Sequence, residues 1–342
     1  MTRRIRPLAL AAAALAIPVA LTGCAASSGA SGDDNQLSIV GFSVMKNANE
    51  PVIAAFQKTD AGKDVSFTTS YGASGDQARA VIGGLHADEV HLSLEPDMTK
   101  LVEADLVDPG WKDNATKGIL TDSVVVFLVR KGNPLGIKSW DDLVKPNVTV
   151  ITPNPESSGS AKWNILAAWA HAAHAPGGND AKAKDFVSKL LHNTIAMPGS
   201  AADAMASFLA GNGDVLVAYE NDSIEARASG EDVDYVVPND TLLIENPAAI
   251  TTDASSAAQD FLDFQHSVAG QTLYAEAGFR PVLDGVEADV PGAEDPSNPY
   301  PEVKQLYTVD QDFGGWSKAD SEFFGDDTGI ITKIISGLNI GS

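Results

Sequence analysis

Small residues and hydroxyl side chains gather in residues 151–164, which read Ile-Thr-Pro-Asn-Pro-Glu-Ser-Ser-Gly-Ser-Ala-Lys-Trp-Asn. A strand is predicted to end here and a helix to begin, with Ser157 or Ser158 as its N-cap. Gly159 and Ser160 would then leave main-chain N–H groups uncovered at the positive end of the helix dipole. Such groups bind an anion without any Lys or Arg. Taken alone, the same pattern also fits an ordinary capped helix that follows a loop.

Two further turns between a predicted strand and a predicted helix are built in the same way. One contains Ser74 in the sequence Gly-Ala-Ser-Gly, and the other contains Gly199 and Ser200. In open α/β sheets, ligands bind at the carboxyl ends of the strands. Three donor-rich turns at such positions favour one ligand with several oxygen atoms more than any single turn does.

The elements that must position these turns alternate between strands and helices, which is typical of α/β domains with mostly parallel sheets. The predicted strands cover residues 37–42, 65–71, 90–94, 123–130, 148–151, 194–197, 213–219 and 233–237. The predicted helices cover residues 50–58, 76–85, 97–102, 139–144, 163–173, 180–191, 201–209, 257–268 and 271–277. The tail that begins at residue 284 is rich in Pro, Gly and acidic residues.

Composition limits the class of protein. The chain has 342 residues, of which 44% are hydrophobic, and this is long enough for two domains with cores. The formal net charge is −23, and residues 1–23 carry three Arg and no acid, so the chain without them carries −23 − 3 = −26. This charge argues against nucleic acid and against a polybasic membrane contact as partners. It suits a soluble exported protein.

The N-terminus has the features of an export signal. Three Arg precede a short apolar run at 8–21, which is too short for a typical membrane span. Leu-Thr-Gly-Cys at 21–24 resembles a lipobox, so we predict a signal peptide at 1–23 and lipidation of Cys24, the only cysteine. The Gly- and Ser-rich residues 24–35 would form the lipidated tether. The alternative is a plain signal peptide followed by an incidental cysteine.

Several longer motifs resemble one known family, the periplasmic sulfate- and thiosulfate-binding proteins of ABC importers. The block Thr-Pro-Asn-Pro, followed by Ser-Gly and then an aromatic residue, is highly specific. The resemblance runs from 70 to 331. Its matching stretches are residues 71–77, 126–134, 150–164, 166–169, 213–216, 279–281 and 313–316.

The resemblance implies an α/β fold of two lobes, the type II periplasmic-binding-protein fold, with mostly parallel sheets and hinge crossings. Residues 36–121 together with 240–342 would form lobe 1, and residues 122–239 would form lobe 2. It further implies a solute-binding component of an ABC importer that captures sulfate between the lobes. Its partners would be the membrane permease subunits, and we expect a lipid-anchored, extracytoplasmic monomer.

In this family the dianion is held without cations, and its donors carry over by motif. Ser74 would offer its N–H, with its hydroxyl as a second candidate donor, and Ser158 would offer its hydroxyl. Gly159 and Ser160 would offer N–H groups, and Ser200 occupies the position of a further N–H donor. The chain departs from the family pattern where Ser160 replaces a second Gly.

A second departure is Tyr219, which stands where the family usually has Trp before Glu-Asn and would donate through its hydroxyl. The motif near Ser43 is also poorly matched. Sulfate carries no proton at pH 7, so a site made only of donors fits it, whereas phosphate needs an acceptor such as a buried Asp. Asp76 and Glu156 are the nearest acids, and both are expected to point to solvent. Thiosulfate, molybdate and phosphate remain the alternative ligands.

An enzyme is the rival class, less favoured than a binding protein. Ser74 lacks the second Gly of a nucleophile elbow, so a hydrolase acting on sulfate esters is the alternative that we carry. His171 and His174 lie three residues apart near a predicted helix end, where a cationic His suits the dipole. A metal site would need more ligands, so we expect no metal, no cofactor and no catalytic residue. Arg280 is expected to form a structural salt bridge.

Overall fold

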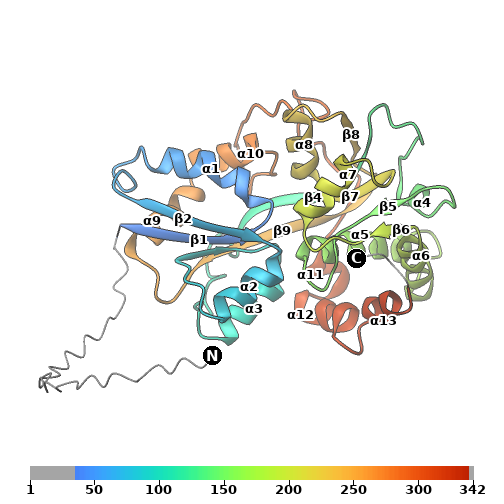
Figure 1. The fold of residues 1–342 in the computed structure, drawn as a ribbon, viewed down its shortest axis with the longest axis horizontal. Coiled ribbons are helices and arrows are strands. Elements are labelled where there is room, and N and C mark those ends of the chain that lie inside the picture. The colour runs from blue at the N-terminus through green and yellow to red at the C-terminus, as the bar shows by residue number, and fades with distance from the viewer. Residues whose placement is uncertain (1–34, 339–342) are drawn as a thin grey trace, which may run out of the picture. The chain divides into compact units, whose positions relative to one another are not determined.

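The structure is a computed structural model that describes residues 35–338. Its strands are β1 (Gln36–Phe42), β2 (Ser66–Gly72), β3 (Glu89–His91), β4 (Ile119–Arg130), β5 (Val150–Ile151), β6 (Thr194–Ala196), β7 (Val215–Tyr219), β8 (Val233–Val236), β9 (Asp240–Ile250) and β10 (Gln305–Tyr307). Its helices are α1 (Met45–Phe56), α2 (Ser74–Ile82), α3 (Glu95–Glu103), α4 (Trp140–Leu143), α5 (Gly159–His174), α6 (Asp180–His192), α7 (Ala201–Leu209), α8 (Glu220–Ala228), α9 (Ser256–Gln265), α10 (Val268–Glu276), α11 (Val309–Phe313), α12 (Trp316–Ala319), α13 (Ile330–Ser336) and the π-helical turn η1 (Asp320–Phe324). Strands and helices alternate along most of the chain (Figure 1), as predicted.

The strands of the described residues form one sheet in the order β2-β1-β3-β9-β4-β7-β5-β6, with β10 paired to β9 and β8 paired to β4. Both ends of the sheet are parallel, since β1 pairs with β2 and β3, and β5 pairs with β6 and β7. Parallel neighbours need crossover connections, and helices supply them here. The middle is antiparallel, where β9 meets β3 and β4. The predicted α/β fold is confirmed.

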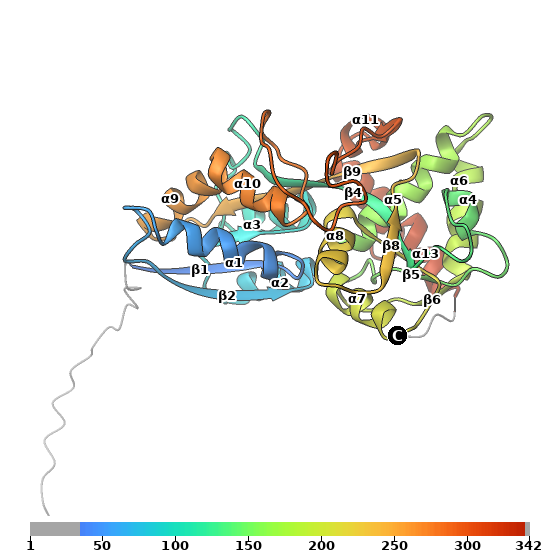
Figure 2. The same ribbon diagram turned by 90° about the horizontal axis from the view of Figure 1, so that it is seen from above.

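Strands β4 and β9 join the two ends of the sheet. Residues 248–250 of β9 pair with β3, and residues 243–247 pair with β4, which continues beside β7. On one side of this crossing lie β1 to β3 with α1, α2, α3, α9 and α10, and on the other lie β5 to β8 with α4 to α8 (Figure 1 and Figure 2). We call these lobe 1 and lobe 2. Both belong to one compact unit, Asp33–Ser342.

The C-terminal helices pack on lobe 2. Trp163 in α5 and Trp316 in α12 meet edge to face with ring centroids 4.6 Å apart, and Trp169 and Phe323 meet in the same way at 4.7 Å. These contacts place Trp316 and Phe323, from the range assigned to lobe 1 by the resemblance, beside α5 of lobe 2. The lobe boundaries stay a prediction.

Helix α5 is buried on nearly all sides, because lobe 2 strands lie on one side of it and the C-terminal helices on another. Small side chains let these neighbours approach closely, while Trp163 and Trp169 fill the remaining volume. The buried Trp163 indole donates to the carbonyl of Ser93 in lobe 1 at 2.8 Å. The first turn of α5 is therefore fixed against the other lobe.

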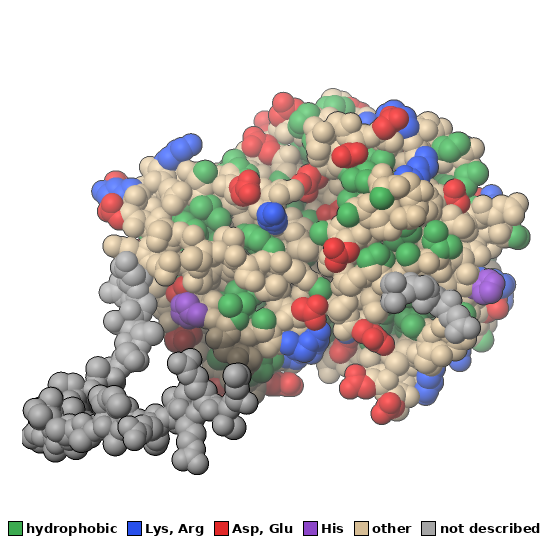
Figure 3. Space-filling model, in the orientation of Figure 1, with side chains coloured by type: hydrophobic (Ala, Val, Ile, Leu, Met, Phe, Trp, Pro, Cys, Tyr) green, Lys and Arg blue, Asp and Glu red, His purple; other side chains and the backbone are tan. Residues whose placement is uncertain are grey.

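The predicted signal peptide, Cys24 and all but the last residue of the tether lie outside the described residues and stay predictions. Between residues 35 and 338, no helix combines the length and the apolar character needed to cross a bilayer. On the face shown in Figure 3, acidic side chains are spread over both lobes, and Lys and Arg are scattered among them. The negative charge is therefore not gathered at one place on this face.

Candidate anion-binding site

Three helices begin at the three donor turns that the sequence predicts. Helix α2 begins at Ser74, α5 begins at Gly159, and α7 begins at Ala201. The residue before each start has an extended backbone conformation, so the first N–H groups of each helix have no partner within it. Each turn therefore presents donors at the positive end of a helix.

Hydrogen bonds between the turns bring all three together. The Gly75 N–H donates to the carbonyl of Ser157 at 3.2 Å, which joins the turn of lobe 1 to the first turn of lobe 2. The Ser157 hydroxyl donates to the carbonyl of Gly199 at 2.7 Å, and the Asn154 N–H donates to the carbonyl of Pro198 at 2.8 Å. The turns thus form one cluster, and their role in binding stays a prediction.

Ser74 is buried, and its hydroxyl is already engaged. It donates to Oδ2 of Asp97 at 2.7 Å and accepts from the N–H of Ser93 at 3.0 Å. Asp97 is itself held by Lys100, whose Nζ lies 2.9 Å from its Oδ1. In this arrangement the Ser74 hydroxyl is not free for a ligand, so the N–H is the donor that Ser74 can offer.

Ser158 precedes α5, and its side chain makes no capping bond to that helix. Its main-chain N–H donates to the carbonyl of Asn154 at 2.8 Å, which fixes the turn. Ser158, Gly159 and Ser160 are all buried where the lobes meet. Of the three predicted serines at helix starts, Ser158 has the hydroxyl best placed to bind a ligand.

Ser200 is the N-cap of α7, and its hydroxyl serves the helix. It accepts from the N–H of Asp203 at 3.1 Å and donates to the carboxylate of Asp203 at 2.7 Å. The residue is nearly buried, with 7% of its surface exposed. As with Ser74, the group that Ser200 can offer is a main-chain N–H, which is the role that the resemblance gives it.

Tyr219 ends β7, and its side chain is fully buried against lobe 1. Its hydroxyl lies 2.8 Å from the hydroxyl of Ser93, and Ser160 lines the same small cavity as Tyr219. Burial raises the pKa of Tyr219 well above its ordinary value, so the phenol keeps its proton and can donate. Ser160 and Tyr219, the two departures from the family pattern, thus lie together.

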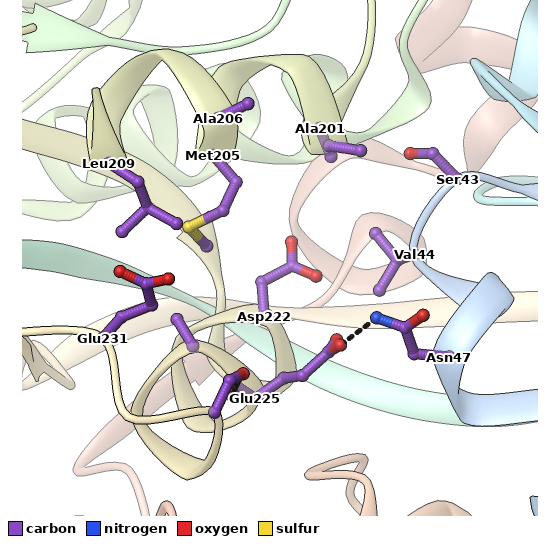
Figure 4. Close-up of a pocket in the computed structure, with 13 residues that line it drawn as sticks. Ser43, Val44, Asn47, Ala201, Met205, Ala206, Leu209, Asp222, Glu225 and Glu231 are labelled. Atoms are coloured by element: carbon purple, nitrogen blue, oxygen red, sulfur yellow. Dashed lines mark hydrogen bonds between the residues drawn. The ribbon is translucent and has the colours of Figure 1, made fainter.

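A cavity of about 270 Å³ lies beside these turns, between α1 and helices α7 and α8 (Figure 4). Its wall carries the carboxylates of Asp222, Glu225 and Glu231, and Asn47 donates to Glu225 across the lobes. Burial and the charge of Glu225 raise the pKa of Asp222 well above its ordinary value. Because its wall carries three carboxylates, this cavity suits a dianion poorly. The turns remain the predicted anion site.

Comparison with known proteins places the chain in a family. The family model for bacterial extracellular solute-binding proteins matches residues 37–280. The chain belongs to this family. It is 38% identical to the sulfate-binding protein of Synechococcus elongatus, over 92% of each chain. It is 37% identical to the sulfate-binding protein of Escherichia coli, over 90% of this chain and 95% of that one. The thiosulfate-binding protein of Pseudomonas aeruginosa is 31% identical, over 87% and 91%.

Solved structures agree with this membership of the solute-binding family. The sulfate-binding protein SubI from Mycobacterium tuberculosis is 43% identical and superposes with a TM-score of 0.80, over 85% of this chain and 99% of that one. The periplasmic binding protein AfuA from Actinobacillus pleuropneumoniae has a TM-score of 0.65 over 88% and 97%, at 20% identity, which shows the fold alone. A family of extracellular proteins indicates an exported protein, as predicted.

This solute-binding protein has charged groups near the cluster that act elsewhere. Arg280 forms a two-bond ion pair with the buried Glu220, at 2.6 Å and 3.0 Å, so the predicted structural salt bridge is confirmed. Asp76 and Glu156 are exposed, as expected. None of these three acids offers an acceptor inside the cluster.

The two predicted histidines pair with carboxylates. His171 Nδ1 lies 2.7 Å from Asp240, and His174 Nε2 lies 3.3 Å from Asp312. Burial lowers the pKa of His171, but the bond to Asp240 outweighs it, and the net shift is upward. Among residues 35–338, no group of three or more His, Cys, Asp or Glu side chains could hold a metal ion.

Proposed function

We propose that this chain is the solute-binding component of an ABC importer and that it captures sulfate between its two lobes. The observation that carries the proposal is the convergence of three helix N-termini on one place, without a free cation among them. Anions bind at such N-termini through main-chain N–H groups and the helix dipole. The names of the relatives, most of them sulfate-binding proteins, support the same ligand.

The donors that we assign to sulfate follow from the geometry of each turn. The N–H groups of Ser74, Gly159, Ser160 and Ser200 and the hydroxyls of Ser158 and Tyr219 would bind its oxygen atoms. Asp97 lies nearby, but its two oxygen atoms are taken by Ser74 and Lys100. A set of donors without a free acceptor fits a fully deprotonated anion and disfavours phosphate.

Thiosulfate is the second candidate, because two relatives are named thiosulfate-binding proteins. It shares the charge and tetrahedral shape of sulfate, but one sulfur replaces an oxygen. Molybdate and phosphate are weaker candidates. We propose no catalytic role, because no histidine is among the hydrogen-bond partners of the hydroxyls of Ser74, Ser93, Ser157, Ser200 and Tyr219 within the described residues.

The partners and the location of the protein follow from the same proposal. The closed lobes would present the ligand to the membrane permease subunits of the importer. Lipidation of Cys24 would anchor the exported monomer at the membrane surface, with residues 24–35 as the tether and residues 1–23 removed. Mass spectrometry of the protein made in its host, with and without Cys24→Ala, would detect the lipid by its added mass.

Thermal melting of the purified protein with sulfate, thiosulfate, molybdate or phosphate tests the proposed ligand. A ligand that binds only the folded state stabilises it by about 4 kcal/mol when its concentration is a thousand times its Kd. We expect the largest rise in melting temperature with sulfate. A rise with phosphate alone would contradict the donor-only site, and no rise with any of the four would contradict the proposal as a whole.

A further inference from the structure

Ser93 lies where the two lobes meet, and every polar group that it carries is hydrogen-bonded. It follows β3 in lobe 1 and is 1% exposed. Its N–H donates to Oγ of Ser74 at 3.0 Å. Its carbonyl accepts from Nε1 of Trp163 and from Nδ2 of Asn246, both at 2.8 Å. Because its hydroxyl also meets Tyr219 at 2.8 Å, Ser93 is bonded to lobe 1, lobe 2 and β9 at once.

The side chain of Ser93 also lies against the first turn of α5. A Cβ atom built on Gly159 would lie 2.6 Å from Oγ of Ser93 and 2.8 Å from its Cβ. The Gly159 N–H is one of the donors that we assign to the anion. The Ser93 hydroxyl therefore lies between a main-chain donor and the phenol of Tyr219.

The hydroxyl protons of this pair can be counted. Ser93 and Tyr219 carry one hydroxyl proton each, and the bond between them uses one of the two. Because the buried phenol stays protonated, one proton is left for a partner outside the pair. Ser160, whose N–H we assign to the anion, lines the same small cavity as Tyr219.

We propose that Ser93 is a positioning residue of the anion site: its hydroxyl holds the phenol of Tyr219 so that the remaining proton points at the bound anion. The proposal rests on the proposed function, because it adds a residue to the same site. The proposal also explains how a tyrosine at position 219 can serve the site, since the hydroxyl proton of a phenol has a fixed direction only when a second group holds its oxygen.

Sulfate affinity and ligand-free stability separate this role from a purely structural one. If Ser93 had only a structural role, Ser93→Ala would lower the melting temperature without sulfate by as much as the loss of any other buried hydroxyl. Thr194→Val is the matched control, because it removes a buried hydroxyl that donates to the carbonyl of Leu190, away from the cluster. A positioning role lowers sulfate affinity in Ser93→Ala and leaves it unchanged in Thr194→Val.

The test is calorimetry with inorganic sulfate. It compares the wild type with Ser93→Ala, Thr194→Val, Tyr219→Phe and the double variant Ser93→Ala/Tyr219→Phe. We expect Ser93→Ala to bind about ten-fold more weakly, mainly through faster dissociation in stopped-flow measurements. Because the two hydroxyls act as one unit, the double variant should lose less affinity than the product of the single losses.

Three outcomes would overturn the proposal while sulfate binding by the wild type still stands. They are unchanged affinity in Ser93→Ala, an equal loss of affinity in Thr194→Val, and losses that multiply in the double variant. If the wild type itself does not bind sulfate, the proposed function fails first. The two failures are therefore distinguishable.

Discussion

The lobes meet closely at Gly159, and Gly159→Ala tests whether closure of this contact is needed for binding. A Cβ atom at this position would lie 2.6 Å from Oγ of Ser93, 2.7 Å from Cδ2 of Leu94 and 2.8 Å from Cβ of Ser93. The substitution keeps the N–H of residue 159, so no anion donor is removed. Any loss of affinity would therefore report the packing of the lobes.

The size of the effect follows from these distances. An extra methyl group in a packed contact costs about 1–3 kcal/mol, and only the state with the lobes in contact carries this cost. We therefore expect sulfate affinity to fall by about five-fold to 150-fold. If the lobes open without sulfate, this cost disappears and only the helix preference of Ala over Gly, up to about 1 kcal/mol, remains. Ligand-free Gly159→Ala should then be no less stable than the wild type.

Calorimetry with sulfate and melting without it measure these two effects separately. Gly199→Ala is the matched control, because the nearest atom to a Cβ at that position, Oγ of Ser157, is 3.9 Å away. The control should bind sulfate like the wild type. Wild-type affinity in Gly159→Ala, or equal losses in both variants, would refute the reasoning.

Three further predictions concern the donors and the buried charges. Ser158→Ala should weaken sulfate binding about ten-fold to a hundred-fold in calorimetry, since a hydroxyl bond to a buried dianion contributes about 1.5–3 kcal/mol; unchanged affinity would remove Ser158 from the site. Burial raises the pKa of Glu89 from 4.5 to about 8, so the folded state keeps a proton that the unfolded state releases. The free energy of unfolding of the wild type should therefore fall as the pH rises from about 4.5 to 8, by on the order of 3–4 kcal/mol in urea titrations. Glu89→Gln should remove this fall. Parallel pH profiles of stability for the wild type and the variant would contradict the prediction. Arg280→Met should destabilise the protein by about 3–5 kcal/mol because it leaves the buried Glu220 unpaired. Adding Glu220→Gln to this variant should restore part of the lost melting temperature. A lower melting temperature in the double variant than in Arg280→Met would contradict this prediction.

The sequence predicts well those parts of the fold that carry a local signal. The sequence predicts Ser157 or Ser158 as the N-cap, and α5 begins directly after Ser158, although the Ser158 side chain makes no capping bond. Helices also begin at the predicted donor turns, and most of the predicted strands are present. These features follow from side chains that are close in sequence, where propensity, turn chemistry and capping act together.

Strand β9 shows where local signals fail. Residues 240–250 read Asp-Thr-Leu-Leu-Ile-Glu-Asn-Pro-Ala-Ala-Ile, and charged residues and Pro247 interrupt the pattern expected of a strand. The strand forms because β3, β4 and β10 pair with it at different points along its length. The C-terminal elements α12 and η1 are short, and their aromatic contacts with α5 likewise join residues distant in sequence.

The site shows the same division. Ser74, Ser158 and Tyr219 could be found from motifs, whereas Ser93 and Asp97 could not, because no local pattern marks them. Ser93 meets Tyr219 across 126 residues of sequence, and Asp97 meets Ser74 across 23. Ser93 and Asp97 contact the proposed site residues only in the folded chain, so the sequence alone could not identify them.

Net charge and local chemistry act on different steps of binding. The chain carries −23, and charges beyond about 8 Å are largely screened at physiological ionic strength. An anion bound at the turns, as we propose, would instead meet three helix N-termini, each with a partial charge of about +0.5. The overall charge would then slow the encounter without deciding the bound state. We expect the contact between Ser93 and Gly159 to exclude water from the donors, which would strengthen each bond that they make.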